Sequence, residues 1–336
     1  MSTAEAVELL RVEGLRTHFF TRHGVAKAVD GVDFSLAKGE RLGLVGESGS
    51  GKSVTALSIM RLVRDPPGRI VGGRILFEGQ DLLALDEAAM RRLRGSRLSM
   101  IFQDPIAYLD PVMRVGDWIA ETLMLHRGLG RKPALTEALR ILRLLKVPSP
   151  EEVVHAYPFQ LSGGMCQRVL IATAIATEPA LVIADEATSA LDVTVQASIL
   201  KTLTELTETL GTALLLTTHN MLVVRKACSR VMVMYAGRVV ESCATDNLFQ
   251  APLHPYTIGL LNSVPALESI GQPLVPMAGE PPLPTDTLPG CAFYARCPLR
   301  QSRCQVERPP LQEVRPGRWS ACFFAEQAGR MRHAAG

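Results

Sequence analysis

One stretch of the sequence has the residue types and spacing of a phosphate-binding loop. The pattern G-x-x-x-x-G-K-[ST] is matched by Gly46-Glu47-Ser48-Gly49-Ser50-Gly51-Lys52-Ser53. Glycines let the backbone curl, so that successive N–H groups and the positive end of the following helix can surround phosphates. Lys52 would add a positive charge, and the Ser53 hydroxyl would bind Mg²⁺. A glycine-rich turn without a ligand is the alternative, but the strand RLGLV before the loop and the helix SVTALSIMRLV after it favour a nucleotide site.

A second candidate site is a pair of acids at the end of an apolar run. The run is Leu181-Val182-Ile183-Ala184, and Asp185 and Glu186 follow it directly. We expect Asp185 to hold the hydration shell of the metal, and Glu186 to orient or deprotonate the water that attacks a phosphate. Acids at strand ends are often only solvated, so the phosphate-binding loop is what favours a hydrolytic role for this pair.

The elements that must position these residues are those of an α/β fold. Between Leu9 and about Phe249, short apolar runs alternate with longer segments of helical periodicity. The runs are RLGLVG, RLSMIF, ALVIAD, ALLLTT and RVMVMY, and the helical segments include TEALRILRLLK and VTVQASILKTLTELTETLG. ALVIAD and ALLLTT are apolar almost throughout, which is typical of parallel strands covered on both faces.

The composition excludes several other classes of protein. With 336 residues the chain exceeds what one hydrophobic core usually organises, so we expect one large domain and an appendage. Basic and acidic residues number 36 and 33, and the net charge of +3 does not indicate a nucleic-acid partner. No apolar run reaches the length of about 18 residues that a membrane-spanning helix needs, and the first residues lack the apolar core of a signal peptide. We therefore expect a cytosolic protein.

The most discriminating string of the chain is Leu161-Ser162-Gly163-Gly164-Met165-Cys166-Gln167-Arg168. It resembles the signature motif of ATP-binding cassette (ABC) ATPases, and other motifs of that family stand around it in the expected order. They are Gln103 in MIFQDP as the Q-loop, Ser189-Ala190-Leu191-Asp192 as the D-loop, and His219 in LLLTTHN as the switch histidine. Phe19 occupies the place of the family's adenine-stacking aromatic ring, with Phe20 as a substitute. Asn220 stands where the family commonly has aspartate.

The resemblance implies a fold and a mechanism. The fold is the P-loop NTPase nucleotide-binding domain of ABC proteins, with a parallel-sheet core, an antiparallel β subdomain and a helical subdomain. ATP and Mg²⁺ are the implied cofactors; Gln103 would join Ser53 and Asp185 at the metal, and His219 would contact the γ-phosphate. Two cassettes of this family stack head to tail, so one chain would complete the ATP site of a second cassette, which is a paralogue or a copy of itself. The residues implied for that role are Ser162, Gly163, Gly164 and Asp192.

A separate, loop-rich appendage begins near Tyr256. The string His254-Pro255-Tyr256-Thr257 resembles the join to the C-terminal region of oligopeptide, dipeptide and nickel importer ATPases. Four of the seven cysteines crowd into this proline-rich segment, namely Cys291, Cys297, Cys304 and Cys322. Four thiolates can bind a tetrahedral Zn²⁺ or hold an iron–sulfur cluster, and free thiols are the third alternative. The resemblance and the Cys297-Pro298 pair favour a [4Fe-4S] cluster over zinc. The remaining cysteines are interpreted as packing residues: Cys166, Cys228 and Cys243.

The predicted organisation is an ABC ATP-binding domain at residues 9–255 and an importer-type C-terminal region at residues 256–336. The resemblance implies the ATP-hydrolysing subunit of an importer of di- or oligopeptides, peripheral on the cytoplasmic face of the cell (inner) membrane. Its implied partners are a second ATPase subunit, two transmembrane permease subunits and an external solute-binding protein. Nickel chelates and glutathione are alternative cargoes. A soluble ABC ATPase acting on nucleic acid or the ribosome is an alternative of another class, which the single cassette and the near-neutral charge disfavour.

Overall fold

The computed structural model describes residues 7–187, 193–263 and 277–331. The chain forms two compact units whose segments interleave in sequence. The first unit comprises Met1–Leu9, Leu36–Glu40 and Asp81–Leu216, and the second comprises Leu10–Ser35, Arg41–Gln80 and Thr217–Gly336. Within the described ranges, no helix combines the length and the apolar character that crossing a membrane requires.

The first unit combines strands with a cluster of helices. Its strands β8 (Ala213–Thr218), β7 (Leu181–Asp185) and β6 (Leu98–Ile101) follow one another in this order, and β6 and β7 are parallel. Every residue of β7 is buried, as its apolar run predicts. The helices are η1 (Leu82–Ala84), α2 (Glu87–Leu93), α3 (Pro105–Tyr108), α4 (Val115–Arg127), α5 (Arg131–Leu144), α6 (Pro150–Val153), η2 (Pro158–Gln160), α7 (Gly163–Ile175) and α8 (Val193–Leu210).

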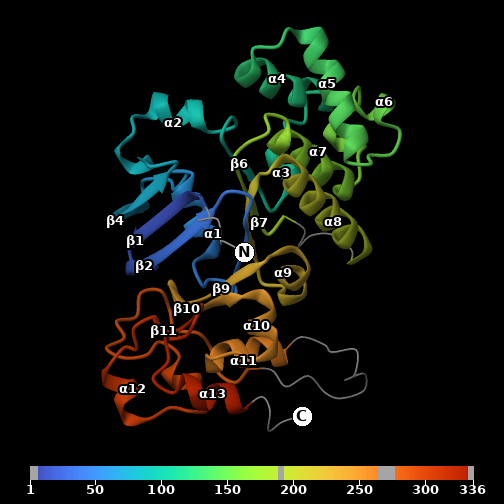
Figure 1. The fold of residues 1–336 in the computed structure, drawn as a ribbon. Coiled ribbons are helices and arrows are strands. Elements are labelled where there is room, and N and C mark those ends of the chain that lie inside the picture. The colour runs from blue at the N-terminus through green and yellow to red at the C-terminus, as the bar shows by residue number, and fades with distance from the viewer. Residues whose placement is uncertain (1–6, 188–192, 264–276, 332–336) are drawn as a thin grey trace. The chain divides into compact units, whose positions relative to one another are not determined.

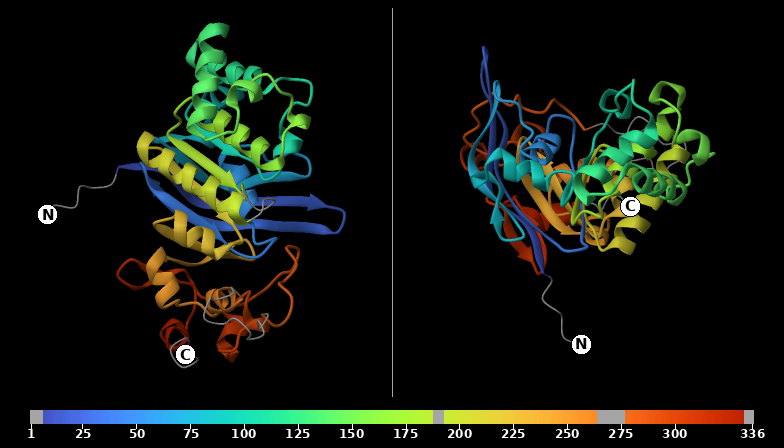
Figure 2. Two further views of the ribbon diagram at one scale, coloured as in Figure 1. Left: turned by 90° about the vertical axis from the view of Figure 1, so that its right-hand side faces the viewer. Right: turned by 90° about the horizontal axis from the view of Figure 1, so that it is seen from above.

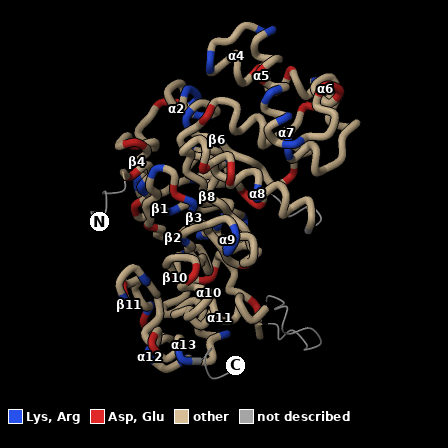
Figure 3. Tube along the Cα trace, turned by 45° about the vertical axis from the view of Figure 1, so that its right-hand side comes forward, with Lys and Arg blue, Asp and Glu red and all other residues tan. Residues whose placement is uncertain are grey.

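Helices α4 to α7, in green shades, gather into one cluster of the first unit (Figure 2). Helix α5 buries Ala134, Ala138 and Ile141, whose spacing of four and three residues places them on one face of the helix. That face packs against α4 and α7. The outer surface of the cluster carries charges of both signs (Figure 3), including the exposed pair Arg143–Glu151. Such exposed pairs add little stability, so apolar packing holds the cluster together.

The second unit contains an antiparallel sheet and a group of mixed strands (Figure 1). The strands β1 (Glu8–Thr21), β2 (Gly24–Ala37), β4 (Gly68–Phe77) and β5 (Gln80–Asp81) form a sheet in the order β2-β1-β4-β5, with β1 and β4 antiparallel. Strand β3 (Arg41–Val45) pairs in parallel with β9 (Arg230–Tyr235), which pairs antiparallel with β10 (Arg238–Ala244). The helices are α1 (Lys52–Ile59), α9 (Met221–Ala227), α10 (Thr245–Gln250), α11 (Pro255–Asn262), η4 (Tyr294–Arg296), α12 (Ser302–Val306) and α13 (Ala325–Met331).

The C-terminal region has more regular structure than its sequence suggests. Strands β11 (Gln312–Arg315) and β12 (Arg318–Ser320) form a hairpin, and β12 pairs with β10. The turn between them contains Gly317 with a φ of +68°, a conformation that glycine adopts without steric cost. The appendage therefore extends the sheet of the second unit, through strands too short to show an alternating pattern.

The predicted α/β fold, with its parallel core, antiparallel β subdomain and helical subdomain, is confirmed. All five apolar runs form strands, and the two predicted helical segments lie in α5 and α8. The division of the chain into residues 9–255 and 256–336 stays a prediction.

Candidate functional site

The phosphate-binding loop joins β3 to α1 in the second unit, as the sequence predicts. Gly51, the N-cap of α1, has a φ of +106°, and a Cβ atom there would lie 2.3 Å from the carbonyl oxygen of Ala28. At Gly46 a Cβ atom would lie 2.3 Å from the carbonyl oxygen of Met234. Both distances are shorter than any real contact of a Cβ atom, so the curled path of the loop requires glycine at these two positions.

Lys52 is folded back onto the loop from the first turn of α1. Its side chain is buried, and its Nζ atom donates to the carbonyl oxygens of Gly46 and Glu47, both at 2.9 Å. Ser53, the next residue of α1, is half-buried. The ammonium group thus lies against the loop that precedes α1, where a phosphate held by the loop would meet it.

Phe19 and Phe20 project from opposite faces near the end of β1. Thr17 lies on the face of Phe19, and its Oγ1 atom is 2.8 Å from Oγ of Ser58 in α1. Phe19 therefore shares the face of β1 that meets the phosphate-loop helix, and it is half-buried opposite Gly68 of β4. Phe20 is 50% exposed, and its ring lies under the guanidinium of Arg69. This arrangement favours Phe19 over Phe20 as the aromatic ring of a nucleotide site.

In the first unit, the ends of β6 and β7 bring a glutamine to the acidic pair. The two strands are parallel neighbours, with Ile101 opposite Ala184, so residues that follow them meet at one sheet edge. The Gln103 Nε2 atom donates to Glu186 Oε2 at 3.3 Å. Asp185, the last residue of β7, is buried. Glu186 has a φ of +45°, a strained conformation of the kind that is held at functional sites.

The signature residues begin α7. Ser162 is the N-cap, and its hydroxyl oxygen accepts a hydrogen bond from the Met165 N–H at 3.4 Å. Its side chain is exposed, and Gly163 and Gly164 follow in the first turn, half-buried. N–H groups at the start of a helix have no carbonyl partner within the helix and can bind an anion. The signature therefore presents a hydroxyl and helix N–H groups at the surface of the first unit.

His219 follows β8 in the second unit, and its side chain is exposed. The next residue, Asn220, caps α9, because its Oδ1 atom accepts from the N–H groups of Leu222 and Val223 at 3.0 and 3.4 Å. Asparagine and aspartate cap helices about equally well. The departure from the family pattern at this position therefore preserves the local structure beside the histidine.

The sequence-predicted residues are divided between the two units. The first unit carries Gln103, Ser162, Gly163, Gly164, Asp185 and Glu186. The second carries Phe19, the loop Gly46–Ser53 and His219. Within one unit, the contact between Gln103 and Glu186 joins residues 83 apart in sequence. The predicted D-loop with Asp192 lies outside the described residues.

The four cysteines of the C-terminal region line one cavity in the second unit, namely Cys291, Cys297, Cys304 and Cys322. Burial raises the pKa of the Cys297 thiol to about 11 and that of the Cys322 thiol to about 12. These two thiols are therefore protonated at neutral pH unless a cation is bound. Among the described residues, no three His, Cys, Asp or Glu side chains lie close enough together to hold a metal ion. The structure therefore does not support the expected metal site, although the four thiols line one cavity.

Residues of the C-terminal region that no sequence motif singles out as functional contact the phosphate-binding loop. The Glu47 N–H donates to the Tyr256 hydroxyl oxygen at 2.8 Å, and the Glu47 carboxylate accepts from both Nη atoms of Arg296 at 2.8 and 2.9 Å. His254, whose pKa burial lowers to about 3, accepts the Tyr256 N–H and caps α11. Tyr256 belongs to the string HPYT and Arg296 directly precedes Cys297, but neither position indicates a contact with Glu47.

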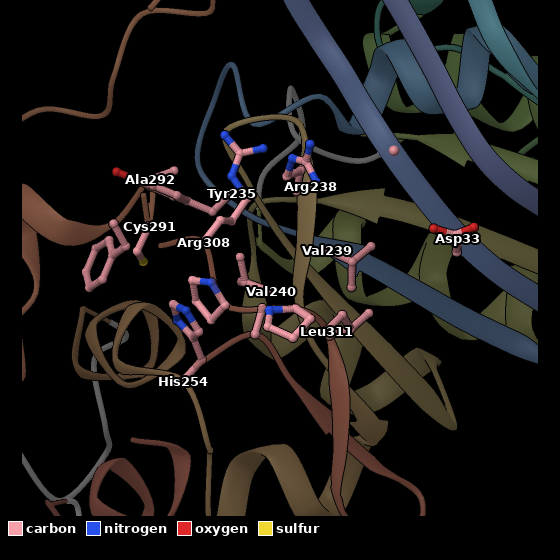
Figure 4. A pocket seen from close by; sticks show the side chains of 15 residues that line it. Asp33, Tyr235, Arg238, Val239, Val240, His254, Cys291, Ala292, Arg308 and Leu311 are labelled. Carbon is pink, nitrogen blue, oxygen red and sulfur yellow. The ribbon is translucent and has the colours of Figure 1, made fainter. Parts of the chain in front are cut away.

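Further contacts anchor the C-terminal region to the antiparallel sheet and to β10. Asp30 of β2 accepts from Arg238 at 2.7 Å and pairs with Arg308 at 3.6 Å. Although burial opposes it, the hydrogen bond and charges of these arginines hold the pKa of Asp30 below its ordinary value. Figure 4 shows a neighbouring pocket, whose walls combine Val239 and Val240 of β10 with residues of the C-terminal region that include Cys291. The appendage is thus an integral part of the second unit.

Comparison with known proteins agrees with these motifs. The ABC transporter family matches residues 29–189, and the family "Oligopeptide/dipeptide transporter, C-terminal region" matches residues 240–304. "Probable peptide ABC transporter ATP-binding protein y4tR" of Sinorhizobium fredii is 47% identical over 327 residues, which cover 97% of this chain and 98% of that protein. The chain belongs to the ATP-binding proteins of ABC transporters.

Other members of this ABC family match the chain over almost its full length. "Oligopeptide transport ATP-binding protein OppD" of Escherichia coli is 46% identical, covering 96% of this chain and 95% of that protein. "Oligopeptide transport ATP-binding protein AppD" of Bacillus subtilis is 44% identical, covering 96% and 98%. The solved structure of the ATP-binding cassette MJ0796, a dimer in a post-hydrolysis state bound to ADP and Pi, matches with a TM-score of 0.64 and 25% identity over 70% of this chain and 99% of that one. The predicted family, ABC ATPase fold and ATP-hydrolysing class are confirmed.

Proposed function

We propose that this chain is the ATP-hydrolysing subunit of an importer of di- or oligopeptides. The observation that carries the proposal is the match of both its parts, the cassette and the C-terminal region, to peptide-transport ATP-binding proteins over almost their full length. The hydrolytic groups that such a subunit needs are present, namely Lys52, Asp185, Glu186 and His219.

The chemistry proposed is in-line attack of water on the γ-phosphate of ATP. Glu186 positions the water and accepts its proton, and the amide of Gln103 at 3.3 Å orients that carboxylate. Lys52 neutralises charge on the phosphates, and His219 contacts the γ-phosphate. Ser53, Gln103 and Asp185 carry oxygen donors of the kind that Mg²⁺ prefers, and the ion, when bound, would supply further charge neutralisation.

A second cassette is required for this chemistry. The phosphate-binding loop already serves the nucleotide of its own chain, so the exposed Ser162 and the half-buried Gly163 and Gly164 are proposed to bind the ATP of a partner cassette. Asp192, outside the described residues, is proposed for the same interface. The partner is a paralogue or a second copy. The dimer found for MJ0796 is consistent with such pairing.

Two permease subunits and an external solute-binding protein complete the proposed transporter. This chain is proposed to bind the permease subunits as a peripheral protein on the cytoplasmic face of the membrane. Apolar side chains just beyond Gln103 support a docking surface for the permease. Ile106 is 66% exposed and Val112 81% exposed, and Tyr108 stacks on Phe102 with 4.0 Å between ring centroids. Exposed apolar groups of this kind are typical of protein contact surfaces.

The four thiols around one cavity support a further proposal, a [4Fe-4S] cluster held by Cys291, Cys297, Cys304 and Cys322. A single zinc ion would need its four sulfur ligands at about 2.3 Å from one centre. A [4Fe-4S] cluster binds one thiolate at each iron, and the described residues contain no formed group for either kind of site. Equal amounts of iron and acid-labile sulfide in brown, anaerobically purified protein would support the cluster, and colourless protein with stoichiometric zinc would refute it.

Affinity purification of the chain from its own cells, in detergent, tests the proposed transporter. We expect two membrane subunits to co-purify, and peptides to be the ligand released from the associated solute-binding protein. Nickel chelates or glutathione as that ligand would correct the cargo. Salt-sensitive retention of DNA or RNA without membrane subunits would replace the importer by the soluble class of ABC ATPase.

A further inference from the structure

Glu47, the second residue of the phosphate-binding loop, is held from three directions. Its N–H donates to the Tyr256 hydroxyl oxygen, and its carboxylate accepts two hydrogen bonds from Arg296. Its carbonyl oxygen accepts a hydrogen bond from Lys52 Nζ at 2.9 Å. One residue therefore connects two side chains of the C-terminal region to the Lys52 ammonium group.

The Arg296 site is built for a charged guanidinium. The side chain is only 4% exposed, and its partner Glu47 is 28% exposed. Its Nε atom donates to the carbonyl oxygen of Ala278 at 3.2 Å, and Nη1 also lies 3.4 Å from the Tyr235 hydroxyl. A buried charge is costly unless it is paired and fully hydrogen-bonded, and a two-pronged arginine–carboxylate pair meets that condition.

Tyr256 is fixed by aromatic packing. It is fully buried, and its ring centroid lies 4.5 Å from that of Tyr235 and 5.5 Å from that of Phe293. Phe293 itself stands on the loop between Cys291 and Cys297 that carries Arg296. The hydroxyl and the guanidinium that hold Glu47 are thus set by one packed group of side chains from β9, α11 and the cysteine loop.

We propose that Arg296 and Tyr256 are positioning residues for ATP binding, which act through Glu47 on the phosphate-binding loop and on Lys52. By holding Glu47 at its N–H and its carboxylate, they keep the loop in its binding conformation before ATP arrives. Without them, part of the binding free energy of ATP is used to order the loop, so the affinity for ATP falls. The rate of hydrolysis of bound ATP does not change. The inference rests on ATP hydrolysis by this chain and is independent of which solute is transported.

The test compares Arg296→Ala, Glu47→Gln and the corresponding double variant in the full chain assembled with its transporter partners. Each single variant should raise KM and the equilibrium Kd for MgATP on the order of tenfold, since a charge-assisted pair is lost, and should leave kcat within about twofold. The double variant should resemble either single one, because both remove the same contact. Arg296→Lys should restore only part of the affinity, since lysine cannot form the two-pronged pair.

Arg315 provides a matched control in the same region. It also forms a two-pronged pair, with Glu326, but both side chains are about half exposed and neither contacts the loop. Arg315→Ala should therefore leave KM unchanged. Glu47→Gln leaves the sequence of the C-terminal region unchanged and keeps one oxygen that can accept from Arg296, so it decides the matter if Arg296→Ala fails to fold. Wild-type KM in Glu47→Gln, additive effects in the double variant, or an equal effect of Arg315→Ala would each overturn the proposal.

Discussion

Replacing Glu186 by glutamine separates nucleotide binding from hydrolysis. The change removes the carboxylate that is proposed to accept the proton of the attacking water, but it keeps the size of the side chain. Gln103 Nε2 now donates to Glu186 Oε2 at 3.3 Å, and the amide of the new glutamine can make a similar polar contact with Gln103. Loss of a general base lowers a rate by about 10²- to 10⁴-fold, which corresponds to about 3 to 5 kcal/mol in the activation free energy.

Two assays measure the outcome of Glu186→Gln. Phosphate release by the assembled transporter should fall by that factor, while the Kd for MgATP should stay within about twofold of the wild-type value. Because ATP is then bound but not cleaved, MgATP should hold the chain and its partner cassette, purified without the membrane subunits, in a closed pair that light scattering after gel filtration detects. Wild-type turnover would show that another residue handles the water, and lost ATP binding would show that Glu186 holds the loop or the metal instead.

Three further changes test other parts of the account. Lys52→Ala removes the ammonium bonded to the Gly46 carbonyl and should weaken ATP binding at least on the order of tenfold in equilibrium titrations; unchanged affinity would contradict its phosphate role. Burial raises the pKa of Glu241 from 4.5 to about 7, so the folded chain holds the extra proton and its stability falls as the pH rises through that window. Relative to Glu241→Gln, the wild type should therefore lose about 2 kcal/mol of unfolding free energy between pH 5 and pH 8 in urea titrations, and a constant difference would refute this. Cys297→Ser changes the residue directly after Arg296, and we expect it to raise KM for ATP. Combining it with Arg296→Ala should raise KM no further; additive effects on KM would show that the two residues act independently.

Much of the site could be predicted because its residues are adjacent in sequence. The loop Gly46–Ser53 needs glycines, a lysine and a serine at fixed spacing between a strand and a helix, and all of these are visible in one string. The meeting of Gln103 and Glu186 follows from parallel strands, since residues after two neighbouring strands reach the same sheet edge. Capping by Asn220 also depends only on local sequence.

The contacts that could not be predicted join distant residues without a repeating pattern. Glu47 and Arg296 are 249 positions apart, and nothing in the composition around either one indicates the other. Strands β11 and β12 are too short for a periodic signal, although the Pro316-Gly317 pair is typical of a turn. The sequence shows that the four cysteines are clustered, but their spacing does not reveal whether the thiols are close enough to bind one ion.

Uptake of a labelled peptide tests the central claim most directly. The purified transporter, with the wild-type chain or Glu186→Gln, is reconstituted into vesicles so that this subunit faces a supply of MgATP and the solute-binding protein is on the other side. The account predicts peptide accumulation with the wild-type chain and ATP, and none with Glu186→Gln or with ADP. Peptide accumulation that continues in Glu186→Gln, or ATP hydrolysis by the wild type without any peptide transport, would contradict it.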